Sequence, residues 1–107
     1  MTIRDDFAYV GDLVDFMPRG GPRIRANDGA QNAIGERAKQ QRLRLSLTQG
    51  QVIARLADAT DGRWNPTDQE IYRIESKTRS VIDLEVLALA EVLGCSVGWL
   101  LTGTDPR

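Results

Sequence analysis

The 107-residue chain contains no histidine and only one cysteine, Cys95. Histidine is the commonest general base and the commonest metal ligand, so its absence argues against Ser-His and Cys-His nucleophilic catalysis and most metalloenzymes. One cysteine cannot form an internal disulfide, and the sequence has no CxxC motif or Cys/His cluster. We therefore expect a protein that is not an enzyme and that uses no metal or cofactor.

Long hydrophobic runs are also missing. No apolar stretch approaches the ~20 residues needed to cross a bilayer. The N-terminal sequence MTIRDDFAYVGD lacks the basic and apolar regions of a signal peptide. The alternation of apolar and polar residues typical of β-strands is absent as well. These features predict an all-α, cytoplasmic protein without membrane association.

The chain has no overall excess of positive charge, because its net charge is −1. The charge is unevenly distributed, however. Residues 34–80 hold nine basic and six acidic residues. Residues 81–107 hold one basic and four acidic residues, and residues 1–33 hold four basic and five acidic residues. A local basic surface can bind phosphates even when the whole protein is nearly neutral. The middle of the chain is therefore the candidate for nucleic-acid contact.

The first 30 residues differ in composition from the rest. Residues 4–17 carry apolar groups at spacings of three and four, which predict an amphipathic helix: Phe7, Val10, Val14 and Met17. Residues 18–30 are rich in Gly, Pro and Asn and contain three arginines, Arg19, Arg23 and Arg25. This arm either lies in a DNA groove or is an unstructured surface segment. We expect residues 1–30 to form an N-terminal segment and arm, and residues 31–104 to form one domain.

A helical pattern begins at Ile34. Its expected core face consists of Ile34, Ala38, Leu43, Leu45 and Leu47. Thr48, with Gln51 three residues later, has the spacing of a capping box and predicts the start of a second helix. The inward residues of this helix are Val52, Ile53 and Leu56. The dipeptide Asp61-Gly62 indicates a turn after it.

A second capping box predicts a third helix over residues 67–76. Thr67 and Glu70 have the required spacing, and Asn65 is the alternative cap because it precedes a proline. Ile71 and Ile74 are expected to face inward.

Two further helices are expected near the C-terminus. Asp83 is the predicted cap of a helix that is apolar nearly throughout and ends at Gly94. Ser96 then begins a short helix that ends at Gly103.

Two stretches, IGERAKQQRLRLSLTQGQVIARL and DQEIYRIESKTRSVIDLEVLALAEVLGCSVGWLLTG, resemble the Xre/Cro/phage-repressor family over residues 34–103. The resemblance is carried by the order and spacing of Arg42, the Leu-Thr-Gln at 47–49, Ile71 with Ile74-Glu75, and the tail ALAEVLGCSVGWLLTG. It implies a compact five-helix, lambda-repressor-like domain with an N-terminal helical or arm extension. It also implies a transcriptional regulator of the repressor type that binds double-stranded DNA as a homodimer.

The resemblance implies a role for individual residues. The second helix would direct its N-terminus at the DNA backbone, with the Gln49 amide donating to a phosphate. The third helix would be the recognition helix in the major groove, where Gln69 can pair with adenine and Arg73 with guanine or a phosphate. Arg42 and Glu75 match a family pair that links the first helix to the third. The full set of expected DNA contacts is Thr48, Gln49, Thr67, Asp68, Gln69, Tyr72, Arg73, Lys77 and Arg79.

The sequence departs from the family pattern in two respects. The segment ADATDGRWNP between the second and third helices is longer than the tight turn of lambdoid repressors, which implies either a longer helix or an inserted loop. We expect Trp64 to anchor this segment to the core. Asp68 and Glu70 place negative charge near the recognition helix, which repels DNA unless a carboxylate accepts from cytosine or serves the helix cap.

The homodimer and a second function involve other parts of the chain. The apolar residues Val97, Trp99 and Leu100 are the expected dimer contact, and the N-terminal amphipathic helix is the other candidate. The alternative function is an antitoxin or another protein-binding helix-turn-helix module. In that case the acidic segment 5–17 would bind a protein partner.

Overall fold

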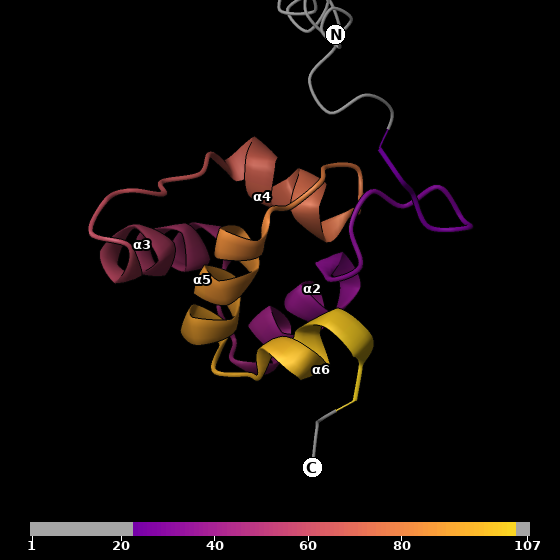
Figure 1. Ribbon diagram of the computed structural model, residues 1–107. Helices are drawn as coiled ribbons and strands as arrows, with labels where there is room; N and C mark the ends of the chain where they lie inside the picture. The colour runs from indigo at the N-terminus through magenta and orange to yellow at the C-terminus, as the bar shows by residue number, and fades with distance from the viewer. Residues whose placement is uncertain (1–22, 105–107) are drawn as a thin grey trace, which may run out of the picture.

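The computed structural model describes residues 23–104, which form five α-helices and no β-strand. In chain order the helices are α2 (Gly35–Arg44), α3 (Gln49–Ala59), α4 (Asp68–Glu75), α5 (Asp83–Leu93) and α6 (Val97–Thr102) (Figure 1). No helix within these residues is long and apolar enough to span a membrane. The all-α prediction is confirmed for this range. The helix predicted for residues 4–17, with the proposed partner segment 5–17, lies outside the described residues.

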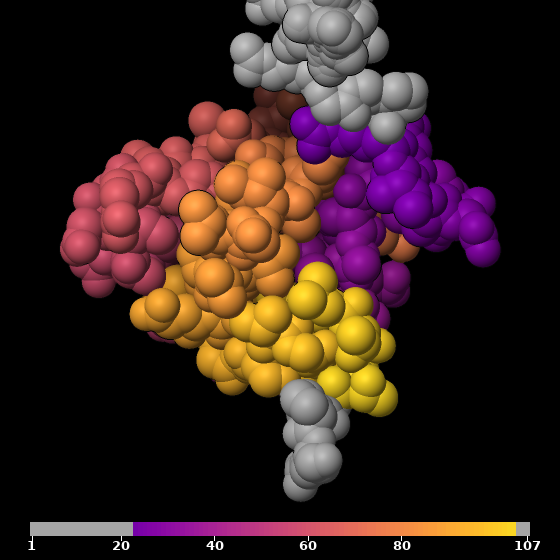
Figure 2. All heavy atoms as spheres, in the orientation of Figure 1, coloured from indigo at the N-terminus to yellow at the C-terminus, as the bar shows by residue number. Residues whose placement is uncertain are grey.

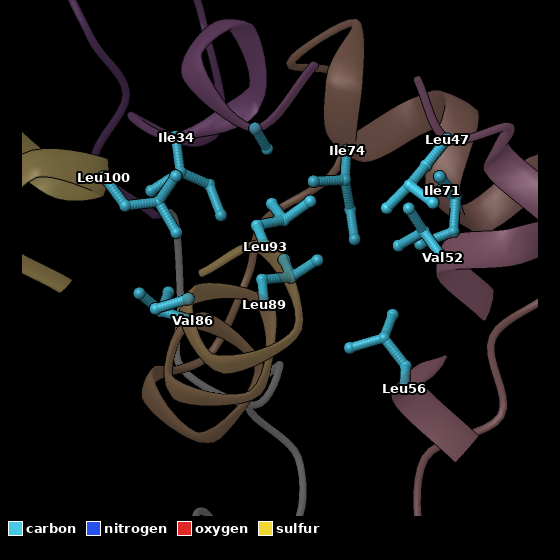
Figure 3. Packing of buried hydrophobic residues seen from close by; sticks show 12 residues of the cluster. Ile34, Leu47, Val52, Leu56, Ile71, Ile74, Val86, Leu89, Leu93 and Leu100 are labelled. Atoms are coloured by element: carbon cyan, nitrogen blue, oxygen red, sulfur yellow. The ribbon is translucent and has the colours of Figure 1, made fainter. Parts of the chain in front are cut away.

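Helix α5 lies at the centre of the core. It contacts α2, α3 and α6. Figure 3 shows Leu89 and Leu93 of α5 between Ile34 and Leu100 on one side and Ile71 on the other. The buried cluster comprises Ile34, Ala38, Leu47, Val52, Leu56, Ile71, Ile74, Val86, Leu89, Ala90, Leu93 and Leu100. Since burial of one large aliphatic side chain contributes about 1.5–3 kcal/mol, this cluster holds all five helices together.

Both predicted capping boxes are confirmed. In α3, the Thr48 hydroxyl accepts from the Gln51 N–H at 3.0 Å, and the Gln51 side chain accepts from the Thr48 N–H at 2.8 Å. In α4, the Thr67 hydroxyl and the Glu70 carboxylate make the same reciprocal pair, each at 3.1 Å. Thr67 is therefore the cap of α4, and Asn65 is not.

The expected core face of the first helix is partly wrong. Leu43 and Leu45 are 57% and 43% exposed. Ile34, Ala38 and Leu47 are buried, as predicted, and Arg42 is buried as well; Ile34, Ala38 and Arg42 recur at intervals of four. The helix ends at Arg44 and Ser46 adopts a left-handed φ of 57°, so the helical spacing does not continue to Leu45. A buried arginine thus takes the place that an apolar residue was expected to fill.

The start of α5 also differs from the prediction by one residue. Asp83 is the first residue of the helix, and Ile82 is its cap. Because Ile82 has no polar side chain, it makes no side-chain cap; its N–H donates to the Glu85 carboxylate at 3.1 Å, and the Asp83 carboxylate accepts from the Leu84 N–H at 2.7 Å. The other boundaries are confirmed, since α5 ends at Gly94 with φ 65° and Ser96 caps α6 through the Trp99 N–H at 3.0 Å.

The connection between α3 and α4 is a loop and not an extension of α3. It runs over residues 60–67, and Asp61 and Gly62 turn the chain with left-handed φ angles of 53° and 78°. The Thr60 hydroxyl accepts from the Trp64 N–H at 2.9 Å and donates to the Leu56 carbonyl at 2.8 Å. Trp64 packs against the core, as predicted. These contacts fix the segment that leads into α4.

Candidate nucleic-acid interface

Helix α4 has one apolar side and one polar side. Ile71 and Ile74 are buried, three residues apart, and fix the inner side. Asp68, Gln69, Tyr72 and Arg73 are exposed. We call these four residues the outer face of α4. The outer face thus presents an amide, a phenol, a guanidinium and a carboxylate from a helix whose other side is packed.

A buried charged cluster holds α4 against α2 and α3. The Arg42 Nε donates to Glu75 at 2.7 Å and its second guanidinium nitrogen donates to the other carboxylate oxygen at 3.0 Å. Arg42 also donates to the Leu47 carbonyl at 2.9 Å, and Gln49 donates to Glu75 at 3.0 Å. The side chains of Arg42 and Glu75 are 10% and 8% exposed. We call Arg42, Gln49 and Glu75 the Glu75 cluster; it links three helices through one carboxylate.

Asn32 and Gly35, which the sequence analysis did not single out, fix the C-terminal end of α4. The Asn32 amide donates to the carbonyls of Ile74 at 3.0 Å and Arg79 at 2.8 Å. Its oxygen accepts from the Ile34 and Gly35 N–H groups, so it also satisfies the first turn of α2. A Cβ on Gly35 would overlap the Ile74 carbonyl oxygen, so the two helices approach there as only glycine allows. An Asn three residues before a Gly at a helix start is the only sequence signal for this contact.

The N-terminus of α3 lies beside α4 through the bond from Gln49 to Glu75. Thr48 is exposed, and Gln49 is partly buried. The Gln49 amide, expected to donate to a phosphate, donates to Glu75 in the free protein. The first-turn N–H groups of a helix and its dipole form a positive site for an anion. The structure therefore brings one such site next to α4.

The two basic residues after α4 are held in ion pairs. Lys77 has a left-handed φ of 67°, and its amine lies 3.6 Å from Glu36 and 4.0 Å from Asp28. Arg79 donates to both carboxylate oxygens of Glu85 at 3.0 Å. Hydrogen bonding to Glu85 raises the pKa of Arg79 above its usual value. Both residues lie near α4, but their charges are already partly neutralised.

The expected dimer contact in α6 is wrong for Leu100. This side chain is fully buried in the core, so it has no surface to offer a second copy. Val97 and Trp99 are partly buried against the same core, and the Arg44 guanidinium lies 5.8 Å from the Trp99 ring centre. The Arg37 guanidinium also fixes α6 to α2, donating to the carbonyls of Leu100 and Leu101 at 2.9 Å. Much of the apolar surface of α6 is thus used within the protomer.

The described residues contain no group of three or more Cys, Asp or Glu side chains placed to hold a metal ion. No family model matches the chain, and no curated protein matches it significantly.

Proposed function

We propose that the protein is a sequence-specific DNA-binding transcriptional regulator of the repressor type, with a lambda-repressor-like helix-turn-helix domain. Helix α4 enters the major groove and its outer face contacts base edges. The observation that carries the proposal is the combination of a polar outer face and an inner side fixed by Ile71, Ile74 and the Glu75 cluster.

The outer face has the chemistry that base contact requires. The major groove is about 12 Å wide and admits one α-helix. Gln69 can make two hydrogen bonds with adenine, and Arg73 can make two with guanine. Both are exposed and lie four residues apart on α4. Such contacts discriminate between bases only when the helix is held at a fixed angle, which is the role of the Glu75 cluster.

The N-terminus of α3 supplies the phosphate contact. Thr48 and Gln49 lie at this end of the helix, next to α4. A phosphate placed there would meet free N–H groups and the positive end of the helix dipole. This contact positions the protein on DNA without selecting a base.

The two carboxylates at the start of α4 have different environments. The Glu70 carboxylate accepts from the Thr67 N–H, so it serves the cap. Asp68 is exposed in the first turn, where the helix dipole stabilises its charge. Asp68 is therefore the better placed of the two to accept a hydrogen bond from a cytosine N4, while both carboxylates keep a negative charge that repels a phosphate.

Selection of bound duplexes from a random pool, at two salt concentrations, tests the proposal. We expect enrichment of a palindromic sequence and an affinity that falls steeply as salt rises, because phosphate contacts release counterions. Gln69→Ala and Arg73→Ala should each lose about 1–3 kcal/mol of preference at particular base pairs. Gln49→Ala should weaken binding to all sequences, and because Gln49 also donates to Glu75, the free energy of unfolding of this variant is measured alongside. Lys39→Ala, an exposed change on α2, serves as the control. An absence of enrichment, with weak binding even at low salt, rules the proposal out.

A further inference from the structure

An open apolar groove of about 400 Å³ lies between α5 and the loop from α3 to α4. Ile82, Leu84 and Leu87 line it and are 54%, 67% and 53% exposed. Trp64 and Ala88 also line it, and both are partly buried against the core. Figure 2 shows the surface of α5, in orange, next to that of α3 and the following loop. Three large aliphatic side chains that are mostly exposed together mark an interaction surface.

The groove is distinct from the interface proposed for DNA. None of its lining residues belongs to the outer face of α4 or to the Glu75 cluster. The large exposed side chains in it, Ile82, Leu84 and Leu87, have no hydrogen-bonding groups for base edges, so DNA is a poor occupant.

We infer that the groove is the surface through which two copies of this chain pair, and that each copy places Leu84 and Leu87 in the groove of the other. A two-fold contact is isologous, which means that every pair of residues in it occurs twice. Such a contact needs one surface that carries both a ridge and a hollow. The exposed leucines of α5 supply the ridge, and the space beside Trp64 and Ala88 supplies the hollow.

The charges on the rim suit a second copy of the same surface. Arg63 and Glu91 both line the groove and both are exposed. The Arg63 Nε donates to the Thr60 carbonyl, but neither Arg63 nor Glu91 forms an ion pair with another described residue. In an isologous contact, Arg63 of each copy can face Glu91 of the other. One surface with one unpaired charge of each sign thus complements itself.

The same charges disfavour the acidic N-terminal segment as the occupant. Residues 4–17 contain four aspartates and one arginine. Arg63 and Glu91 cancel on the rim, and Asp83 adds a negative charge beside Leu84. An acidic segment would therefore meet a rim without net positive charge, whereas a second copy gains two ion pairs.

The consequence for DNA rests on the proposed function. A regulator that binds a palindrome needs two copies whose recognition helices contact two half-sites about one helical turn apart. Pairing through the groove leaves the outer face of α4 uncovered in both copies. The oligomeric state itself is measured without DNA, so failure of the pairing and failure of DNA binding give different results.

Sedimentation equilibrium of the full-length chain, over a range of concentrations, tests the inference. We expect the wild-type chain to show a monomer–dimer equilibrium. In the double variant Leu84→Glu/Leu87→Glu, the dissociation constant of the dimer should rise about tenfold or more. Arg63→Glu and Glu91→Arg should each weaken the dimer, and their combination should restore it because the ion pairs re-form with reversed signs. Leu43→Glu, exposed on α2, should leave the equilibrium unchanged. Circular dichroism confirms that each variant remains helical.

Three results would overturn the inference. The first is a wild-type chain that stays monomeric at every concentration. The second is a dimer that Leu101→Glu, on α6, dissociates while the groove variants do not. The third is a monomer that dimerises only when Phe7→Asp and Val14→Asp break the apolar stripe of the N-terminal segment, which would identify that segment as the occupant.

Discussion

Helices α4 and α5 both pack an aliphatic side against the core, but they differ in the residues on the side that faces away from it. Each buries a set of aliphatic residues against the common core, Ile71 and Ile74 in α4 and Val86, Leu89, Ala90 and Leu93 in α5. The opposite side of α4 carries Asp68, Gln69, Tyr72 and Arg73, whereas the opposite side of α5 carries Leu84 and Leu87.

This difference between the exposed sides of α4 and α5 means that each side suits a different kind of binding partner. A polar outer face on a fixed helix suits groups that hydrogen-bond, such as base edges. An exposed pair of leucines suits another apolar surface, because their burial is the main favourable term. One small domain thus carries a polar helix face that suits the proposed DNA contact and an apolar helix face that suits the proposed pairing with a second copy.

Removal of Glu75 should have the largest effect on the α4 side. Glu75→Ala leaves the Arg42 guanidinium buried without a counter-charge, which costs about 3–5 kcal/mol. Urea denaturation measures this loss. Glu36→Ala, which removes only an exposed partner of Lys77, should cost less than about 1 kcal/mol. Equal losses in the two variants would show that the Glu75 cluster does not hold α4.

A methyl group at Gly35 should have the next largest effect. Gly35→Ala pushes α2 away from the Ile74 carbonyl and should lower the free energy of unfolding by about 1–3 kcal/mol. The control is Gly50→Ala, where the nearest atom would be 3.8 Å away and alanine favours the helix. Thermal denaturation distinguishes the two. A stable Gly35→Ala variant would contradict the close approach of α2 to α4.

The cap of α4 contributes less. Thr67→Ala removes the hydroxyl that accepts from the Glu70 N–H and should cost about 1 kcal/mol. Thr67→Ser keeps the hydroxyl and should retain most of the stability. If both variants lose the same stability, the methyl group of Thr67 matters and the cap does not.

The smallest effect should come from the outer side of α5. In dilute solution, where the chain is monomeric, Leu84→Ala should change the free energy of unfolding by no more than about 0.5 kcal/mol. Leu89→Ala, on the inner side of the same helix, should cost about 2–5 kcal/mol. Chemical denaturation at low protein concentration gives both values. A large loss for Leu84→Ala would mean that this leucine supports the protomer itself.

The sequence predicted helix starts better than it predicted exposed faces. The Thr48-Gln51 and Thr67-Glu70 boxes depend on contacts within four residues, so local spacing was sufficient to place them. The exposure of Leu43 depends on Arg42 lying inside the core. An arginine there is compatible with burial only because a distant carboxylate compensates its charge, and spacing alone does not reveal this.

The sequence predicted the exposed residues of the candidate site but not the contacts that hold them in place, because only the exposed positions follow from local spacing. The outward positions of Gln69 and Arg73 follow from the inward positions of Ile71 and Ile74. The two bonds from Asn32 to the Ile74 and Arg79 carbonyls join residues more than 40 positions apart. The pairing of Arg79 with Glu85 spans six residues across the turn between α4 and α5. Contacts of this kind depend on the tertiary fold.

The most direct test of the central claim is amide chemical-shift mapping of the labelled protein, titrated with the duplex enriched by selection. We predict the largest changes at Gln69, Tyr72 and Arg73 on α4 and at Thr48 and Gln49 on α3, with Leu84 and Leu87 little affected by DNA. Changes concentrated on α5 or α6, with α4 unchanged, would contradict the assignment of α4 as the DNA-contacting helix.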